Sequence, residues 1–164
     1  MDLYTITKFF HVVFAIIAVG WNASYGLWLA RAAREPQATQ LFTLKTIKLM
    51  DDRVANPLYG LLALSGLLMV FTAGLPLTTR WIAAAIVLYV IAIVFAFTQI
   101  TPNFRVALRA LESEGPESAA YRAAMAKGRR MGIAISVVVL GIVFLCSDDA
   151  SGVTGAAIPV TART

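Results

Sequence analysis

Four long stretches of the chain carry no formal charge, and they restrict its fold more than any other feature. They are Phe9–Ala30, Val54–Thr79, Trp81–Phe104 and Met131–Ser147. Because a helix rises about 1.5 Å per residue, roughly 20 apolar residues cross the hydrocarbon core of a bilayer. The first three runs exceed that length, and the fourth is near the lower limit of about 17 residues. The runs predict four membrane-spanning helices over about residues 5–30, 54–73, 81–101 and 131–147.

The composition supports the same class. Of the 164 residues, 59% are hydrophobic and only 14% are charged, whereas about 25% of a typical soluble domain is charged. The expected fold class is therefore an all-α, integral membrane four-helix bundle formed by residues 1–147. The segment 148–164 is mostly small and polar, which predicts a disordered tail.

Basic residues gather in two of the connections between the runs. These residues are Arg31, Arg34, Lys45, Lys48 and Arg53, and then Arg105, Arg109, Arg122, Lys127, Arg129 and Arg130. Basic loops of membrane proteins remain on the cytoplasmic side. The pattern predicts a multi-pass protein of the cell (inner) membrane with both termini on the non-cytoplasmic side. Because these charges border apolar spans, we expect no nucleic-acid binding.

Prolines divide the helical segments near the two basic connections. Pro36 ends the first helix, and from Thr39 the chain is amphipathic, either as an interfacial helix or as an extension of the second span. Asn56-Pro57 predicts a kink or a fresh helix start. After the third run, helix is expected to resume through Phe104–Leu111 and to stop before Pro116, so that a short helical hairpin projects into the cytoplasm.

His11, the only histidine, lies inside the first run. A charged side chain at the bilayer centre costs about 2.5 kcal/mol or more, so an ionisable residue there suggests a functional site. One interpretation is a hydrogen bond to a neighbouring helix. The other is ligation of the iron of haem b through one imidazole nitrogen. Lys8 lies one turn away, and Met69 is a candidate second ligand; water or another subunit are alternatives.

Polar residues are expected at similar depth in the bilayer, near the side that carries the two basic connections. They are Asn22, Tyr25, Asp52, Asn56, Tyr59, Gln99 and Asn103. This polar cluster could hold a ligand headgroup or water. Alternatively, its members are ordinary interface residues and interhelical hydrogen bonds.

Small residues predict where helices approach closely. Gly60 and Gly66 lie in the second run, and Gly128, Gly132 and Ser136 repeat at intervals of four residues. Small residues at this spacing form helix-packing surfaces in membranes.

Several chemistries lack the residues they need. The second to fourth runs contain no Asp, Glu, Lys or Arg, and the chain has one histidine and one cysteine, Cys146. These counts argue against proton or ion relays, a bis-histidine haem within one chain, and a histidine–cysteine metal cluster beyond a possible haem iron. We identify no catalytic residues, and the sequence leans against an enzyme.

Some of these motifs occur together in a bacterial family. Lys8-Phe-Phe-His11-Val-Val, Val19-Gly20, Asp52 ahead of Asn56-Pro57, and Gly60 with Gly66 resemble a family of predicted integral membrane proteins of unknown function. The resemblance extends over roughly residues 3–146. It implies four spans with a histidine early in the first. The family is more distantly similar to the copper-resistance D membrane domain and to the haem-binding protoporphyrinogen oxidase membrane family. The latter similarity implies haem at His11.

Three functions remain open from the sequence. The leading one is an accessory or assembly subunit whose bundle packs with a second copy or with a larger membrane complex. The second is a haem b-binding membrane redox protein or oxidoreductase with His11 as axial ligand. The third is a small-solute or metal permease, which would need a continuous polar path.

Overall fold

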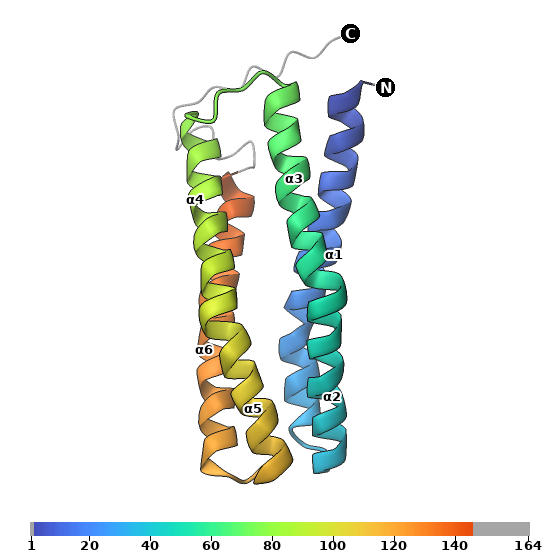
Figure 1. The fold of residues 1–164 in the computed structure, drawn as a ribbon, viewed down its shortest axis with the longest axis vertical. Coiled ribbons are helices and arrows are strands. Elements are labelled where there is room, and N and C mark those ends of the chain that lie inside the picture. The colour runs from blue at the N-terminus through green and yellow to red at the C-terminus, as the bar shows by residue number, and fades with distance from the viewer. Residues whose placement is uncertain (1, 146–164) are drawn as a thin grey trace.

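The computed structural model describes residues 2–145, and all its regular structure is helical (Figure 1). Four helical stretches are long and apolar enough to cross a membrane: Leu3–Ala32, Gln37–Thr72, Arg80–Ser113 and Ala119–Leu145. The predicted all-α class with four spans is confirmed. The sidedness of the termini stays a prediction. Cys146, the last residues of the fourth predicted span and the predicted tail at 148–164 lie outside the described residues.

Two of the four stretches are continuous α-helices. In the first, α1 (Leu3–Ala32), the Asp2 side chain caps the start by accepting a hydrogen bond from the Thr5 backbone N–H at 2.8 Å. This hydrogen bond holds the pKa of Asp2 below its usual value. In the last, α6 (Ala119–Leu145), the Ser118 hydroxyl accepts a bond from the Tyr121 N–H at 3.2 Å.

The other two stretches each contain one π-helical turn. The second consists of α2 (Gln37–Met50), η1 (Asp51–Ala55) and α3 (Asn56–Thr72). The third consists of α4 (Arg80–Phe95), η2 (Ala96–Ile100) and α5 (Thr101–Ser113). The amphipathic segment after Thr39 is thus an extension of the second span. At the basic end, the helices run beyond the predicted span limits.

Each π-helical turn immediately precedes an X-Pro pair. The Asn56 N–H donates to the Asp51 carbonyl, and the Thr101 N–H donates to the Ala96 carbonyl, so both bonds span five residues. Proline has no N–H, and its ring clashes with the carbonyl four residues earlier. A wider turn accommodates Pro57 and Pro102 without ending the helix. The predicted interruption at Asn56-Pro57 is therefore this π-turn followed by the start of α3.

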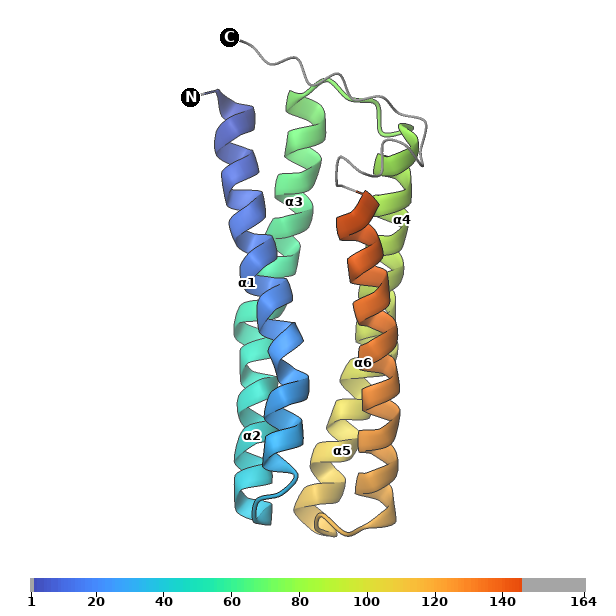
Figure 2. The ribbon, with the colours of Figure 1, turned by 180° about the vertical axis from the view of Figure 1, so that it is seen from behind.

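The chain forms two helical hairpins. The first hairpin packs α1 against α3, α2 and η1, and the second packs α6 against α4, η2 and α5 (Figure 2). The connection between hairpins turns at Gly74, and the α5–α6 connection turns at Gly115. Both glycines have positive φ angles, +66° and +86°, which favour glycine.

The buried core joins the two hairpins at one end. We call this the basic end, because the α1–α2 and α5–α6 connections lie there (Figure 1). Its buried members come from α2, α5 and α6: Leu44, Ala107, Ala110, Leu111, Tyr121 and Ala124. The α5–α6 hairpin, which the sequence predicts to project into the cytoplasm, also packs against α2 through α5.

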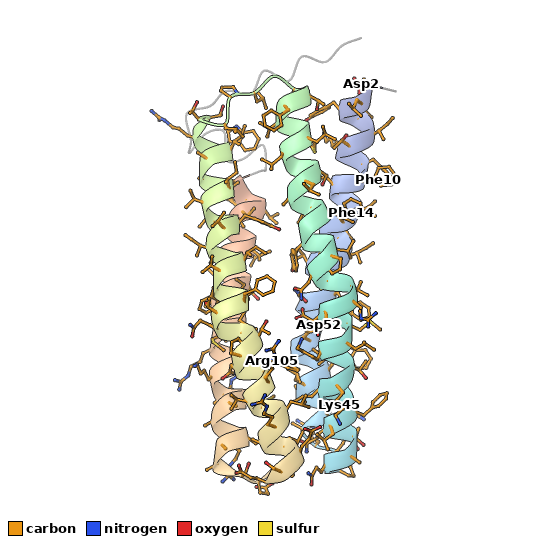
Figure 3. All side chains as sticks on the ribbon, viewed as in Figure 1. Asp2, Phe10, Phe14, Lys45, Asp52 and Arg105 are labelled. Carbon is orange, nitrogen blue, oxygen red and sulfur yellow. The ribbon has the colours of Figure 1, made fainter. Side chains whose placement is uncertain are left out.

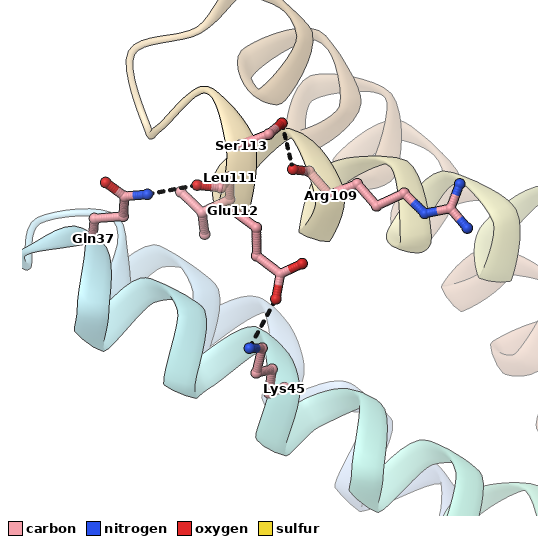
Figure 4. A network of polar contacts seen from close by, with 6 residues as sticks. All are labelled: Gln37, Lys45, Arg109, Leu111, Glu112 and Ser113. Atoms are coloured by element: carbon pink, nitrogen blue, oxygen red, sulfur yellow. Dashed lines mark hydrogen bonds and ion pairs between the residues drawn. The ribbon is translucent and has the colours of Figure 1, made fainter.

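Polar contacts at the basic end reinforce this packing. The Gln37 amide donates to the Leu111 carbonyl at 2.6 Å, and Lys45 pairs with Glu112 at 2.8 Å (Figure 4). Deeper in the interface, the Tyr121 hydroxyl donates to Gln40 Oε1 at 3.1 Å. Each of these contacts links α2 to the second hairpin. They hold the hairpins together away from the bilayer centre.

Large apolar side chains cover the rest of the bundle surface (Figure 3). Examples exposed by half or more include Phe9, Ile16, Leu64, Val87 and Val137. Because these residues belong to the uncharged runs, lipid tails or another membrane helix can cover them.

Candidate functional site

The first candidate site is the contact between His11 on α1 and Ser65 on α3. His11 Nδ1 lies 2.9 Å from Ser65 Oγ, and Ser65 is buried. The Ser65 hydroxyl also lies 2.7 Å from the Leu61 carbonyl and 3.1 Å from the Leu62 carbonyl of its own helix. Since the single hydroxyl proton of Ser65 points to these carbonyls, its oxygen is free to accept a hydrogen bond from His11.

This arrangement selects one histidine tautomer. Nδ1 carries the proton and donates to Ser65, because the Ser65 proton is already committed to its helix. Nε2 then has a free lone pair. The imidazole also lies within hydrogen-bonding reach of the Leu62 backbone carbonyl, which the Ser65 hydroxyl approaches at 3.1 Å. A neutral imidazole with one nitrogen held and the other free is the state that ligates a metal.

Gly66 gives the imidazole the space it occupies. A Cβ atom at Gly66 would lie 3.1 Å from His11 Cε1 and 3.6 Å from Nδ1. Gly66 therefore faces α1, as the predicted small-residue contact requires. Lys8 is exposed, and no described residue pairs with it. Met69 lies one helical turn beyond Ser65 and is half-buried.

A second polar contact joins the same two helices nearer the basic end. The Asn22 amide donates to the Tyr59 hydroxyl at 2.7 Å, and that hydroxyl lies 3.4 Å from the Ala18 carbonyl. From the other hairpin, the Tyr89 hydroxyl donates to the Tyr59 carbonyl at 2.7 Å. Tyr89 was not predicted as a site residue, although a hydroxyl in so apolar a run of α4 was the available signal.

Two polar atoms beside this contact are buried without a hydrogen bond. They are Asn22 Oδ1 and the Tyr25 hydroxyl. The Trp21 side chain approaches the Tyr25 hydroxyl, but no bond of 3.5 Å or shorter forms. Buried polar atoms are normally satisfied by protein or by ordered water. Asn22 Oδ1 and the Tyr25 hydroxyl are thus unsatisfied by the residues that the structure describes.

The remaining polar residues of the predicted cluster lie in two places. Asp52 is exposed and pairs with Lys48 one turn earlier, and Asn56 is half-buried at the start of α3 (Figure 3). Gln99 and Asn103 lie on the second hairpin, where the Asn103 amide donates to the Ala124 carbonyl at 2.9 Å. The structure brings Asn22 and Tyr59 together and places Gln99 and Asn103 beside α6.

The other small residues differ in their surroundings. A Cβ at Gly128 would lie 3.3 Å from the Asn103 amide nitrogen, whereas Gly60 and Gly132 have nothing within 4 Å. Ser136 is exposed and donates to the Gly132 carbonyl at 2.8 Å. Gly128 thus serves contact within the second hairpin, while Gly60 and Gly132 leave open surface.

These features define an α-helical membrane protein of four spans whose polar side chains lie mainly between helices. The chain belongs to the family described as predicted integral membrane protein (DUF2269), whose model matches residues 5–147. No curated protein and no solved structure matches the chain significantly. Family membership establishes the class of protein and leaves its biochemical role to be argued from the site.

Among the described residues, the donor set is small. No group of three or more His, Cys, Asp or Glu side chains among them could hold a metal ion. The arrangement offers one imidazole nitrogen, one buried amide oxygen and one buried phenolic hydroxyl. These groups suit axial ligation by His11 or the binding of a small polar molecule.

Proposed function

We propose that the protein is an accessory or assembly subunit whose bundle packs against a second copy or a larger complex in the cell (inner) membrane. The observation that carries this proposal is the open surface at Gly132. Its neighbour Ser136 is exposed, and no side chain of the described residues lies within 4 Å of a Cβ at Gly132. Small residues that face no helix of their own chain permit close approach of another helix.

Low burial along the spans supports the same proposal. Only 6% of the most apolar window of Arg80–Ser113, and of Ala119–Leu145, is buried within the chain. Membrane helices gain stability by packing, since lipid tails are as apolar as their side chains. A partner helix beside α6 would supply packing that this chain lacks.

The test is the mass of the protein extracted with its native lipids. We expect a discrete species larger than the 17.7 kDa chain, and Gly132→Leu should convert it to a folded monomer. Gly141→Leu is the matched control, because Gly141 is nine residues away on the opposite face of α6 and also has nothing within 4 Å. A monomeric wild type, or equal effects of both variants, would contradict the proposal.

The orientation belongs to the same proposal. Both basic connections would face the cytoplasm and both termini the other side, supported by the distribution of lysine and arginine. A reporter that is active only outside the cytoplasm, fused after Thr164, should be active. Activity of a cytoplasm-dependent reporter at that position would reverse the orientation.

A second candidate is a haem b-binding redox protein, favoured by the geometry of His11. Ser65 accepts a bond from Nδ1 at 2.9 Å and so leaves Nε2 available. Haem bound there would supply one-electron chemistry. Ser65 would orient the imidazole, and the lone histidine means that any second axial ligand is of another type or comes from outside the chain.

The absorbance of the purified protein tests this candidate. If it holds, the protein from haem-replete cells shows a Soret band that sharpens on reduction and is lost in His11→Ala. Ser65→Ala, which keeps the ligand but removes its orienting partner, should weaken retention of haem. A colourless wild type that retains its fold would leave His11 as an interhelical hydrogen-bond donor.

A further inference from the structure

A surface cleft lies between the second π-helical turn and α6. Its volume is about 390 Å³, and η2 and α5 form one wall while α6 forms the other. Its lining includes Thr98, Gln99, Asn103, Ala123 and Lys127. The cleft belongs to the second hairpin only, away from His11.

The polar groups of the cleft offer hydrogen-bond donors and one positive charge. Lys127 and Gln99 are exposed, and neither forms a hydrogen bond or ion pair with a described residue. The Thr98 hydroxyl donates to the Val94 carbonyl at 2.7 Å, and the Asn103 amide to Ala124. No carboxylate lines the cleft. An ammonium group and a free amide without a counter-anion select an anion.

The position of the cleft indicates which anion. The third uncharged run ends at Phe104 and the fourth begins at Met131, so the cleft straddles the border between apolar and basic chain. Toward the apolar side, Ile91 and Val94 continue the face of Thr98 and are about half exposed. A phospholipid has this same order, with an anionic phosphate at the interface and acyl chains deeper in the bilayer.

We propose that this cleft binds the phosphate headgroup of an anionic phospholipid, with Lys127 and Gln99 as donors and the acyl chains along α4. The π-helical turn contributes directly, because the residues that widen the helix, Thr98 and Gln99, form the upper wall. This site is independent of the proposed subunit role and of haem binding.

The experiment is native mass spectrometry of the full chain with phosphatidylglycerol or phosphatidylcholine of identical acyl chains. We expect preferential retention of phosphatidylglycerol, weakened about fivefold in Lys127→Ala, as one basic residue at a membrane surface contributes. Arg129→Ala is the matched control. This substitution also removes one positive charge from α6, but Arg129 does not line the cleft.

A second variant tests whether lipid retention depends on the space in the cleft and not only on the charge of Lys127. Ala123→Phe keeps every charge and fills the space, so it should also weaken phosphatidylglycerol retention while helix content stays unchanged. Equal losses in Lys127→Ala and Arg129→Ala would show diffuse attraction and overturn the proposal. Equal retention of the two lipids, or unchanged phosphatidylglycerol retention in Ala123→Phe, would also overturn it. Displacement of phosphatidylglycerol by millimolar inorganic phosphate would overturn it too, and would assign the site to free phosphate.

Discussion

The two hairpins use different interactions to hold their helices together. In the first, side chains of opposite helices bond to each other at two levels, His11 to Ser65 and Asn22 to Tyr59. In the second, small buried residues such as Ala107 and Ala124 form the contact between α5 and α6, and the Asn103 side-chain amide donates one hydrogen bond to a backbone carbonyl of α6. We call the helix contact within each hairpin its seam. The first seam carries groups that a ligand or a proton can engage, whereas the second is chiefly a packing surface.

The difference extends to the polar groups that each hairpin leaves unpaired. In the first hairpin, Asn22 Oδ1 and the Tyr25 hydroxyl are buried between helices. In the second, Gln99 and Lys127 lie at the surface beside the cleft. The unpaired polar groups of the first hairpin are therefore enclosed by its helices, whereas those of the second are open to lipid and solvent.

The largest effect should come from separating the hairpins at their shared core. Leu111→Ala removes a fully buried side chain at the basic end, and such truncations cost about 2–5 kcal/mol. Thermal unfolding in detergent, followed by tryptophan fluorescence, should show a large drop in Tm. Val106→Ala on the same helix, where the side chain is 53% exposed, should change it little. Similar changes in both variants would mean that the core does not join the hairpins.

A smaller effect should distinguish the two seams. Asn22→Ala removes the side-chain bond to Tyr59, and interhelical bonds in membranes contribute about 0.6 kcal/mol, at most about 1.7. The matched variant Asn103→Ala removes a bond to the Ala124 carbonyl. We expect Asn22→Ala to change the mobility of the α1–α3 seam, seen as faster hydrogen exchange there, and Asn103→Ala to act only on α5 and α6. Faster exchange in both hairpins for either variant would deny that the seams are separate.

Much of this fold follows from the sequence, because bilayer thickness demands long apolar helices. The uncharged runs predicted four spans, and Asn56-Pro57 predicted an interruption where η1 gives way to α3. The bend of α5 onto α2 was not predicted, since Leu44 and Leu111 are far apart in sequence and nothing local pairs them. The hairpin packs there because burying these leucines removes apolar surface from water beyond the bilayer.

The candidate site was predictable by residue type and less so by partner. His11 and Asn22 were identified because polar groups are rare in an apolar helix. Their partners Ser65 and Tyr59 depend on the crossing of α1 and α3, which the sequence does not specify. Depth along the membrane grouped Gln99 and Asn103 with Asn22, but depth does not specify which helices are adjacent.

The smallest effect should come from adding one methyl group to α3, either at Gly60, which faces open space, or at Gly66, which faces His11. Gly60 has nothing within 4 Å, so Gly60→Ala should raise stability by about 0.4–1 kcal/mol through the reduced entropy of the unfolded chain. Gly66→Ala gains the same entropy but places its Cβ 3.1 Å from His11 Cε1, which the Ser65 bond holds in position. We expect the gain at Gly66 to be cancelled or reversed. Adding His11→Ala should restore it, because the clash is then absent, and unfolding of the four variants in a double-mutant cycle measures the coupling. Equal stabilisation by Gly60→Ala and Gly66→Ala would mean that the imidazole is free to move, which would remove the ordered histidine on which the haem candidate depends.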